Sequence, residues 1–353
     1  MYLRIGLIAA SAALVLAGCG SFPAGMPADS QTLTEVEPDL SNSADSQTLT
    51  EVEPDLSNSA VIPEELKRDF GLTDWSIVDS KLQGAVSGGP GKDGIPSIDT
   101  PTFLPIASFD HPDSVQAIVM NDGDDIKVYP YNILTWHEIV NDTVNGVPVA
   151  VTFCPLCGSA IVFDRRVDNE ALTFGVSGFL LESNMIMFDR ENEALWQQST
   201  GRALAGRDSN TELQLAPFQL MTMGEIKNMY PQALVLSEDT GHPRDYGRNP
   251  YAGYEDSEGY YFAPSREDAR YPSKMIFVVS RYGGEIFGIP LPELADGAGF
   301  ELSVGGDTIE VERLSETITI TDPRGEQLPF YFEMWFSFAS QHGADAIVFD
   351  PAT

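Results

Sequence analysis

Residues that ligate transition metals or act as nucleophiles are scarce in this sequence. Its 353 residues include 3 cysteines and 4 histidines. A glycine-rich phosphate loop and a Gly-x-Ser-x-Gly elbow are both absent, which argues against P-loop nucleotide binding and α/β-hydrolase chemistry. The His-Glu-x-x-His motif of zinc peptidases is also absent, because His137-Glu138 is followed by Asn141 where the second histidine would stand.

Positive charge is scarce as well. The chain has 20 lysines and arginines against 53 aspartates and glutamates, which gives a net charge of −33 at pH 7. Nucleic acids and anionic lipid surfaces bind through lysine and arginine, so an excess of acidic residues repels both. We therefore expect no nucleic-acid partner, and the sequence identifies no protein partner.

Long apolar runs are confined to residues 1–19. Arg4 precedes an apolar run that ends in Leu16-Ala17-Gly18-Cys19, and this run is shorter than the roughly 20 residues that a membrane-spanning helix needs. The pattern is typical of a secretory signal peptide with a lipobox, and it resembles bacterial lipoproteins, in which the lipobox cysteine carries the lipid. We expect an exported cell-envelope lipoprotein, on the periplasmic side or the cell surface, that Cys19 anchors to the membrane. A short transmembrane anchor is the alternative.

Basic residues are missing altogether from residues 20–60. The 16-residue sequence ADSQTLTEVEPDLSNS occupies 28–43 and is repeated unchanged at 44–59. A segment that is acidic and has little apolar surface to bury repels itself, so we expect a disordered, extended tether. An acidic binding tail is the alternative interpretation.

The remaining residues, 61–353, are predicted to form a single globular domain of the β-rich α+β class. Strand-like runs are short and mainly antiparallel strands are expected. Glycine and proline, of which the whole chain has 31 and 24, are frequent between the elements. The predicted helices are few and short: Pro63–Phe70, Ile133–Val140, Met223–Tyr230 and Met334–His342.

A weak internal repeat suggests pseudo-duplicated hairpin units. Ala117–Leu134 and Ile276–Leu294 both read as a strand, a glycine-containing turn, a second strand and then an element that starts at proline. Two unrelated hairpins would give the same pattern, so the sequence leaves both interpretations open.

The densest chemistry lies around a Cys-Pro-Leu-Cys motif. Val147–Phe153 alternates as a strand does, and another apolar strand follows Gly158, so the motif is expected on a tight turn between two strands. With Cys19 assigned to the lipid, Cys154 and Cys157 are the two thiols left free. No helix pattern follows Cys157, so the thioredoxin-like placement of a Cys-x-x-Cys at a helix N-terminus is not expected.

Two thiolates three positions apart supply half of a tetrahedral metal site. We expect His137 to converge on the two sulfurs as a third ligand, with copper or zinc as the ion. Another histidine, a carboxylate or the thioethers of Met185 and Met187 are alternative ligands. Two other interpretations stay open: a dithiol that cycles through a disulfide, and a plain structural disulfide or buried reduced pair.

A second dense stretch, Phe174–Gly206, supplies candidates for a pocket. The adjacent Asp189 and Arg190 form either a structural ion pair or part of a pocket rim. Trp196 either floors a small-molecule pocket or is buried with its indole N–H satisfied. The pocket candidates are Ser177, Asn184, Asp189, Arg190, Trp196 and Gln198.

Four stretches between Pro101 and Leu294 carry a resemblance to a known family: YPYNILTWHEIVND, VTFCPLCGSAIVFDR, FGVSGFLLESNMIMFDRENEALWQQSTGRALAG and YPQALVLSEDTGHPRDYGRNPYAGY. Together they resemble the exported bacterial and archaeal proteins catalogued as domain of unknown function 3179. The resemblance implies the same set of site residues but no reaction. The family pattern matches His137, Glu138, Asn141, Asp142, Cys154, Pro155, Cys157, Ser177, Gly178, Ser183, Asn184, Asp189, Arg190, Trp196, Gln198, Gly201, Gly206, Tyr246, Pro250 and Tyr254.

The sequence thus predicts a membrane-anchored lipoprotein whose Cys154, Cys157 and His137 bind copper or zinc. The first alternative is a thiol–disulfide redox enzyme that uses Cys154 and Cys157. The second is a non-catalytic protein that holds a ligand over Trp196. Sequence alone does not decide whether the protein is an enzyme.

Overall fold

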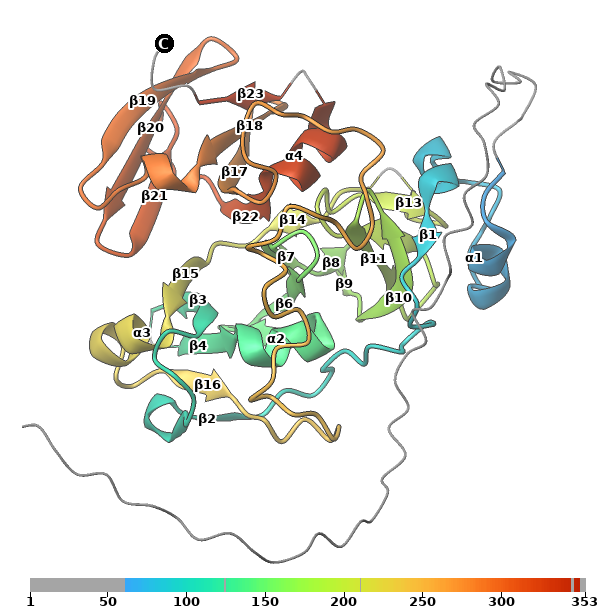
Figure 1. Cartoon of the computed structure of the whole chain (residues 1–353), viewed down its shortest axis with the longest axis horizontal. Helices are drawn as coiled ribbons and strands as arrows, with labels where there is room; N and C mark the ends of the chain where they lie inside the picture. Colours follow the sequence, from blue (N-terminus) through green and yellow to red (C-terminus); the bar gives the residue numbers. More distant parts are fainter. Residues whose placement is uncertain (1–60, 124, 210, 344–345, 350–353) are drawn as a thin grey trace, which may run out of the picture. The chain divides into compact units, whose positions relative to one another are not determined.

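Antiparallel strands predominate in the computed structural model, which describes residues 61–349 except 124, 210, 344 and 345 (Figure 1). The predicted β-rich fold with few short helices is confirmed. All described residues fall within one unit, 58–353. The predicted signal peptide, the lipidation site Cys19 and the acidic repeat lie outside the described residues. Within the described part, no helix is long and apolar enough to span a membrane.

The largest sheet contains the Cys-Pro-Leu-Cys motif. Its strands run in the order β23-β18-β17-β22-β7-β6-β5, with β14 paired to β7. The bounds are β5 Ile139–Val144, β6 Val147–Cys154, β7 Ser159–Asp164, β14 Gln214–Leu215, β17 Ile276–Tyr282, β18 Glu285–Pro290, β22 Phe330–Met334 and β23 Ile347–Val348.

Two five-stranded sheets and two smaller ones complete the β-structure. One runs β15-β3-β4-β16-β2, made of β2 Phe103–Pro105, β3 Gln116–Asp122, β4 Asp125–Pro130, β15 Gln219–Thr222 and β16 Leu234–Leu236. The other runs β1-β10-β11-β12-β13, made of β1 Val86–Ser87, β10 Phe174–Leu181, β11 Asn184–Asp189, β12 Leu195–Gln197 and β13 Ala203–Ala205. The smaller sheets consist of β19 Gly299–Val304, β20 Asp307–Leu314 and β21 Thr317–Thr321, and of β8 Arg166–Val167 and β9 Glu170–Ala171.

Helices are short and mostly follow strands directly. Their bounds are α1 Glu64–Asp69, α2 Tyr131–His137, α3 Met223–Met229 and α4 Trp335–His342, with 3-10 turns η1 Ser80–Gly84, η2 Ile106–Ser108 and η3 Leu291–Glu293. The helix predicted over Ile133–Val140 is wrong at its end. It stops at His137 because Glu138 adopts a left-handed conformation, and Val140 belongs to β5, where it pairs with Val151.

The internal repeat predicted from the sequence is present in the fold. In the hairpin β3–β4, Ala117 pairs with Pro130, and in the hairpin β17–β18, Phe277 pairs with Pro290. Both ladders contain the same succession of pairs, and a helical element starts directly after each proline, α2 in one case and η3 in the other. The equivalence extends beyond the hairpins. β15 pairs with β3 and is followed directly by α3, and in the same way β22 pairs with β17 and is followed directly by α4.

We call β3, β4, α2, β15, α3 and β16 the first copy, and β17, β18, η3, β22, α4 and β23 the second. In each copy the last strand joins the hairpin in parallel, β16 beside β4 and β23 beside β18. In each copy a long insertion separates the first helical element from the next strand. The first insertion contains β5–β14 with both thiols, and the second contains the three-stranded sheet β19–β21.

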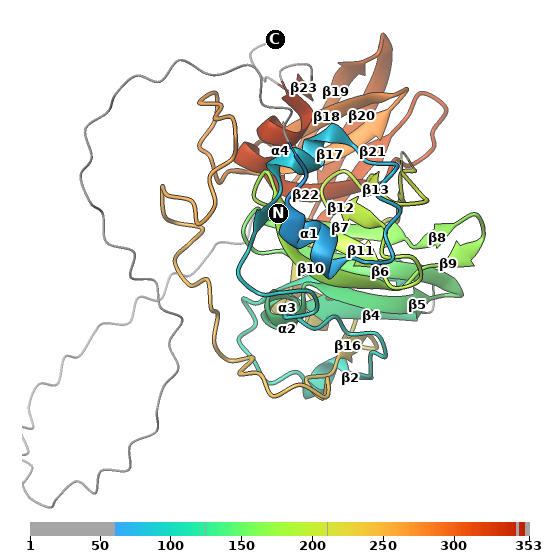
Figure 2. The ribbon, with the colours of Figure 1, turned by 90° about the vertical axis from the view of Figure 1, so that its right-hand side faces the viewer.

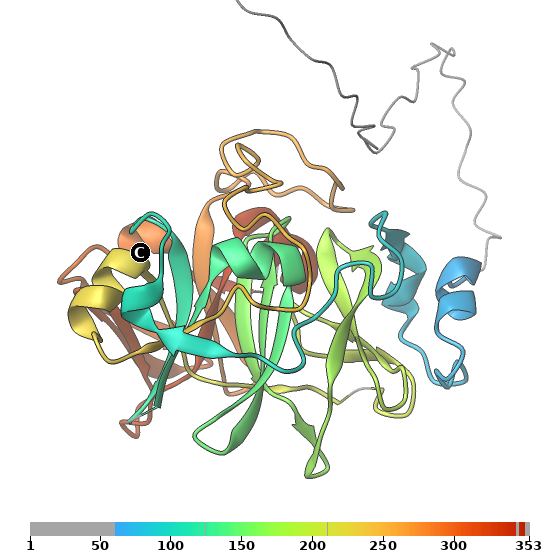
Figure 3. The same ribbon diagram turned by 90° about the horizontal axis from the view of Figure 1, so that it is seen from below.

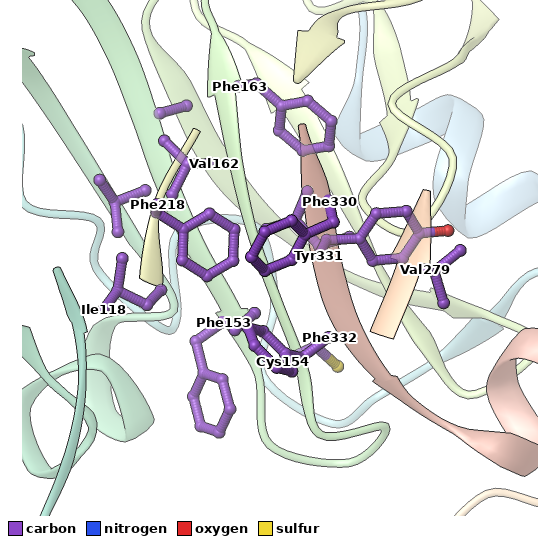
Figure 4. Packing of buried hydrophobic residues seen from close by; sticks show 14 of the residues in the cluster. Ile118, Phe153, Cys154, Val162, Phe163, Phe218, Val279, Phe330, Tyr331 and Phe332 are labelled. Carbon is purple, nitrogen blue, oxygen red and sulfur yellow. The ribbon is translucent and has the colours of Figure 1, made fainter. Parts of the chain in front are cut away.

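The core continues from the central sheet into the second copy. Phe218 packs against the rings of Phe330 and Phe332, with centroid distances of 6.2 and 5.8 Å. Figure 4 shows these rings beside Phe153 and Cys154 at the end of β6. The thiol turn is therefore part of the main core, and not an exposed hairpin tip.

A long irregular segment, residues 237–275, connects β16 to β17, and we call it the cover segment. It lies on the side of the sheet that carries α2 and α4 (Figures 2 and 3). Trp136 of α2 donates to the carbonyl of Arg248 over 3.2 Å, and Trp335 of α4 donates to the carbonyl of Asp268 over 2.8 Å. The cover segment is thus tied to both copies.

Candidate functional site: a buried dithiol

The two cysteines lie on a turn between strands, as predicted. β6 ends at Cys154, β7 begins at Ser159, and the amide of Cys157 donates to the carbonyl of Cys154 over 3.3 Å. Gly158 closes the turn with φ 57°, where an added Cβ would meet the side chain of Met334 at 3.0 Å. Glycine fits this position because the left-handed conformation and the close neighbour both disfavour a side chain.

Both thiols are free and almost completely buried, Cys154 at 1 % exposed and Cys157 at 0 %. The sulfur of Cys157 accepts a hydrogen bond from the side-chain amide of Asn184 over 3.2 Å. It also contacts the hydroxyl of Ser159 at 3.2 Å, where either group can be the donor. A buried sulfur surrounded by polar groups differs from an inert core cysteine, which packs as a small apolar side chain.

Gln198 connects these groups into a network. Its carbonyl oxygen accepts from Ser159 and from Asn184, each over 2.6 Å, and its amide donates to Thr152 over 2.9 Å. Ser159 has one hydroxyl proton, so it can donate either to Gln198 or to Cys157. While Cys157 is a thiol, its S–H can donate to Ser159, and when Cys157 is a thiolate the hydroxyl can turn toward the sulfur. The network therefore accommodates both protonation states.

The pKa values of the two thiols move in opposite directions. Burial opposes ionisation of Cys157, but hydrogen bonds from Cys154, Ser159 and Asn184 outweigh it and lower the pKa of Cys157 to about 7. Burial and the neighbouring Cys157 raise the pKa of Cys154 well above its ordinary value. The pair thus separates into one sulfur that ionises near neutral pH and one that keeps its proton.

Two buried carboxyl groups flank the dithiol. Burial first, and then the charge of Cys157, raise the pKa of Glu138 to about 8, and the same two causes raise the pKa of Glu333 to about 8. One oxygen of Glu333 accepts from Ser199 and from Ser337, each over 2.6 Å, while its other oxygen has no partner among the described residues. At neutral pH both carboxyls therefore hold their protons while Cys157 carries a charge.

His137 is bound elsewhere in the site. Its Nδ1 lies 2.7 Å from the carbonyl oxygen of Pro96, and its Nε2 lies 2.8 Å from the hydroxyl of Tyr246. The ring is fully buried, and burial lowers the pKa of His137 to about 4. In this arrangement His137 is a neutral group that fastens α2 to the cover segment through Tyr246.

Among the described residues, no group of three or more histidine, cysteine or acidic side chains is arranged to hold a metal ion. Met185 and Met187 are both buried within β11. The predicted copper or zinc site stays a prediction, in which the two thiols remain as candidate ligands.

Of the predicted pocket residues, Asn184 and Gln198 join the dithiol and the others do not. Asp189 and Arg190 form no ion pair with each other: Asp189 is buried at the end of β11, whereas Arg190 lies just beyond the strand and is half-buried. Arg190 pairs instead with Asp93 at 2.9 Å and Asp99 at 3.1 Å. The other three have local roles: Asp189 accepts from Trp196 over 3.0 Å, Trp196 is fully buried with its indole satisfied, and Ser177 accepts from the amide of Phe179 over 3.0 Å.

A cavity of about 610 Å³ reaches the outer side of the thiol turn. Phe153, Pro155 and Gly158 line it, and Tyr254 of the cover segment, which also lines it, donates to the carbonyl of Leu156 over 2.9 Å. The cavity lies where the two copies meet, because equivalent positions of both line it: Gln116 with Ile276, Tyr131 with Leu291, and Leu220 with Phe332. A larger cavity of about 950 Å³ shares some of these lining residues, but no residue of the thiol turn lines it.

Four residues of the site are not among those predicted from the sequence: Thr152, Ser159, Ser199 and Glu333. Of these four, Glu333 has a signal in the sequence, because it is a single acidic residue within the apolar strand FYFEM. A charge inside a buried strand needs a partner or a function. The threonine and the two serines have no such signal, because these residue types are common in exposed strands and turns.

Comparison with known proteins gives one match. Residues 92–327, more than half of the chain, match the model of a family described as "Protein of unknown function (DUF3179)". The match extends on both sides of the predicted Pro101–Leu294. No curated protein and no solved structure matches the chain.

Proposed function

This chain belongs to the family of proteins of unknown function DUF3179, and from that premise, which assigns no reaction, we propose that Cys154 and Cys157 carry out thiol–disulfide exchange. The partner is a molecule that contains a disulfide or a dithiol. The two cysteines pass two electrons to it, or receive two from it, by closing or opening their own disulfide.

One observation carries the proposal: the hydrogen bond from Asn184 to the sulfur of Cys157, inside the core. A donor aimed at a buried sulfur stabilises the thiolate, which is the reactive form in exchange. An attacking thiol works best when its pKa lies near the ambient pH, and the pKa of Cys157 is lowered to about 7. Cys157 is therefore the nucleophile, and Cys154, which keeps its proton, is the second thiol.

The exchange takes place in two steps. The Cys157 thiolate attacks one sulfur of a substrate disulfide, forms a mixed disulfide and releases the other substrate sulfur as a thiolate. Cys154 then loses its proton and attacks the sulfur of Cys157, which forms the Cys154–Cys157 disulfide and releases the second substrate thiolate. The dithiol has lost two electrons and the substrate has gained them.

A two-coordinate copper(I) site on the same sulfurs is the second candidate. The two thiols are neighbours on one turn, and soft thiolate ligands select copper(I). In this version Cys154 and Cys157 are the ligands and His137 is not, because both its ring nitrogens lie within hydrogen-bond distance of other groups. Zinc fits less well, since it takes four ligands.

Export and membrane attachment through Cys19 are part of the proposal. A reduced dithiol outside the cytoplasm is exposed to oxidants, so burial of both sulfurs protects it until a partner enters. The cavity beside Phe153 and Pro155 is the proposed point of approach, and the cover segment must move for a disulfide to reach Cys157.

The test uses the full chain, reduced and then freed of reductant under nitrogen. The protein is mixed with glutathione disulfide, and the products are separated and analysed by mass spectrometry. We expect the loss of two thiols per chain and a Cys154–Cys157 disulfide. Cys154→Ser should instead retain glutathione on Cys157, whereas Cys157→Ser should react far more slowly.

Failure to form the Cys154–Cys157 disulfide at any ratio of glutathione to glutathione disulfide would exclude thiol–disulfide exchange. Equal modification of both single variants would contradict the assignment of Cys157 as nucleophile. Tight copper(I) binding that needs both cysteines, together with no exchange, would favour the second candidate.

A further inference from the structure

Glu138 has an unusual backbone conformation for a buried residue. It ends α2 with φ 57°, a left-handed conformation in which glycine is the usual residue. Nine non-glycine residues of the described part have positive φ, and two of them, Glu138 and Ser183, are buried. Both adjoin the dithiol: Glu138 interacts with the charge of Cys157, and the carbonyl of Ser183 accepts from the thiol of Cys154 over 3.9 Å. Unfavourable conformations of this kind concentrate at functional sites.

Hydrogen bonds on both sides fix the backbone of Glu138. Its amide donates to the carbonyl of Leu134 over 2.6 Å, and its carbonyl accepts from the amide of Phe153 over 2.8 Å. Phe153 directly precedes Cys154, so the end of α2 is joined to the strand that delivers the first thiol. The position of Glu138 is thereby set relative to the dithiol.

The carboxyl of Glu138 has no hydrogen bond or ion pair with any described residue, although the residue is only 6 % exposed. The groups that interact with it electrostatically are Cys157 and Cys154 from the turn and Tyr251 from the cover segment. A buried carboxyl without a partner is costly. Glu333 differs, because two serines satisfy one of its oxygens.

We propose that Glu138 moves the protons of the exchange reaction, first giving one to the departing substrate thiolate and then taking one from Cys154. This inference rests on the function proposed above. It assigns the step that the cysteines cannot perform alone, which is deprotonation of a thiol buried at 1 % exposure.

The steps balance in atoms and charge. Cys157 attacks as a thiolate, and the first substrate thiolate leaves with the proton of Glu138 as a neutral thiol. The ionised carboxylate then removes the proton of Cys154, and the resulting thiolate attacks the sulfur of Cys157. The Cys154–Cys157 bond forms, the second substrate sulfur leaves as a thiolate, and Glu138 is protonated again.

The charge of Cys157 explains the order of these events. Burial and that charge raise the pKa of Glu138 to about 8, so the carboxyl holds its proton while Cys157 is a thiolate. A mixed disulfide removes the charge, which lowers the pKa of Glu138 and frees the proton at the moment when it is needed. Tyr251 stays neutral, because burial and then Glu138 and Cys154 raise its pKa.

The test follows the two steps separately. Full-length wild type, E138Q and E138G are reduced, mixed with glutathione disulfide and quenched with acid at intervals. Mass spectrometry then measures the mixed disulfide on Cys157 and the closed Cys154–Cys157 disulfide. In E138Q the mixed disulfide should accumulate, and its closure at pH 7 should slow by about 100-fold, the lower end of the range for general acid–base catalysis.

The pH profile separates proton transfer from a structural role. In E138Q, closure should accelerate about tenfold per pH unit toward pH 9, because free hydroxide must replace the carboxylate, whereas the wild type should level off. E138G removes both the carboxyl and the unfavourable conformation, so its melting temperature should be unchanged or higher while closure slows equally. Glu193→Gln is the control, a glutamate with φ 56° that pairs with Lys92 away from the dithiol, and its exchange kinetics should match the wild type.

The outcomes distinguish this inference from the proposed function. If the wild type closes its disulfide and E138Q does so at the same rate with the same pH profile, the proton role of Glu138 is refuted while thiol–disulfide exchange stands. A lower melting temperature of E138G with normal closure would also overturn it, in favour of a structural role. If the wild type forms no disulfide, exchange itself fails and the inference fails with it.

Discussion

The side-chain amide of Asn184 donates a hydrogen bond to the sulfur of Cys157 across 3.2 Å, although Asn184 lies 27 residues further along the chain. The carbonyl oxygen of the Asn184 side chain accepts a hydrogen bond from the backbone amide of Ser199 over 2.9 Å. Asn184 therefore joins the thiol to the turn after β12 that contains Gln198 and Ser199, and its removal should affect reactivity and stability separately.

Asn184→Leu, which keeps the side-chain size but not the donor, should raise the pKa of Cys157. The rate of alkylation by iodoacetamide, measured against pH, should show a midpoint above the value of about 7 in the wild type. Loss of the partner for Ser199 should cost about 1–3 kcal/mol of unfolding free energy. Ser159→Ala serves if the first variant folds poorly, and Asn121→Leu on the exposed surface of β3 is the matched control. An unchanged midpoint in both site variants would contradict the assigned role of the network.

Glu333→Gln should change how stability depends on pH. The pKa of Glu333 is about 8 in the fold against an ordinary 4.5, so between these values the folded state binds more protons than the unfolded state. Stability from this group is present below pH 4.5 and is lost as the pH rises to about 8. Subtracting the urea-unfolding free energies of the variant from those of the wild type should give a decline on the order of 2–4 kcal/mol across that range. A flat difference would mean that Glu333 ionises normally.

His137→Ala should loosen the cover segment without removing a metal ligand. The variant loses the contact with Tyr246, so limited proteolysis within residues 237–275 should accelerate. Its affinity for copper(I) should stay within about twofold of the wild type, whereas Cys157→Ala should lose binding. Tyr246→Phe, which lacks only the hydroxyl, should reproduce the proteolysis result. A tenfold loss of copper affinity in His137→Ala would restore the three-ligand site.

Tyr254→Phe should make the thiols easier to reach. The hydroxyl of Tyr254 donates to the carbonyl of Leu156 inside the thiol turn, and its loss weakens the cover over the cysteines. At fixed pH, total alkylation of Cys154 and Cys157 should accelerate severalfold, with no change in the midpoint of the pH profile. Tyr261→Phe is the control, because Tyr261 stacks on Tyr254 but is 58 % exposed. Equal rates in all three proteins would show that access does not depend on this bond.

Cys19→Ser should release the protein from membranes. The lipobox cysteine is the predicted lipid carrier, so fractionation of cells should move the variant from the membrane to the soluble fraction. Deleting one copy of the repeat, 28–43, should leave the melting temperature of the body within about 1 °C, because an acidic segment with few apolar residues has little to bury. A membrane-bound variant, or a large loss of stability on the deletion, would refute the anchor-and-tether interpretation.

Local patterns were sufficient to predict the thiol turn and the repeated hairpins. Apolar and smaller residues alternate along Val147–Phe153, as in a strand that leads into the thiol turn. Asn145-Gly146, with φ values of 47° and 79°, closes the hairpin between β5 and β6. The hairpins β3–β4 and β17–β18 are likewise made of neighbouring residues. In such cases the residues that pair are also adjacent in the sequence.

Long-range contacts were beyond the reach of these patterns. Ser199 meets Glu333 across 134 positions, and His137 meets Tyr246 across 109. The expectation that His137 approaches the sulfurs came from its place in the chain, but the hydroxyl of Tyr246 and the carbonyl of Pro96 occupy its nitrogens. The end of α2 was misplaced because nothing in the pattern shows that a glutamate takes a conformation usual for glycine.

The place of β7 in the central sheet has a consequence for the newly made chain. Its neighbour β6 comes directly before it. On its other edge it pairs with β14 and β22, and β22 is among the last strands to be synthesised. The hairpin that carries the thiols can therefore form early, while the strand whose Met334 amide binds the carbonyl of Cys157 arrives late. Until β22 is made, the dithiol lacks part of its cover, so the order of synthesis sets how long the sulfurs are open to oxidants before the fold closes over them.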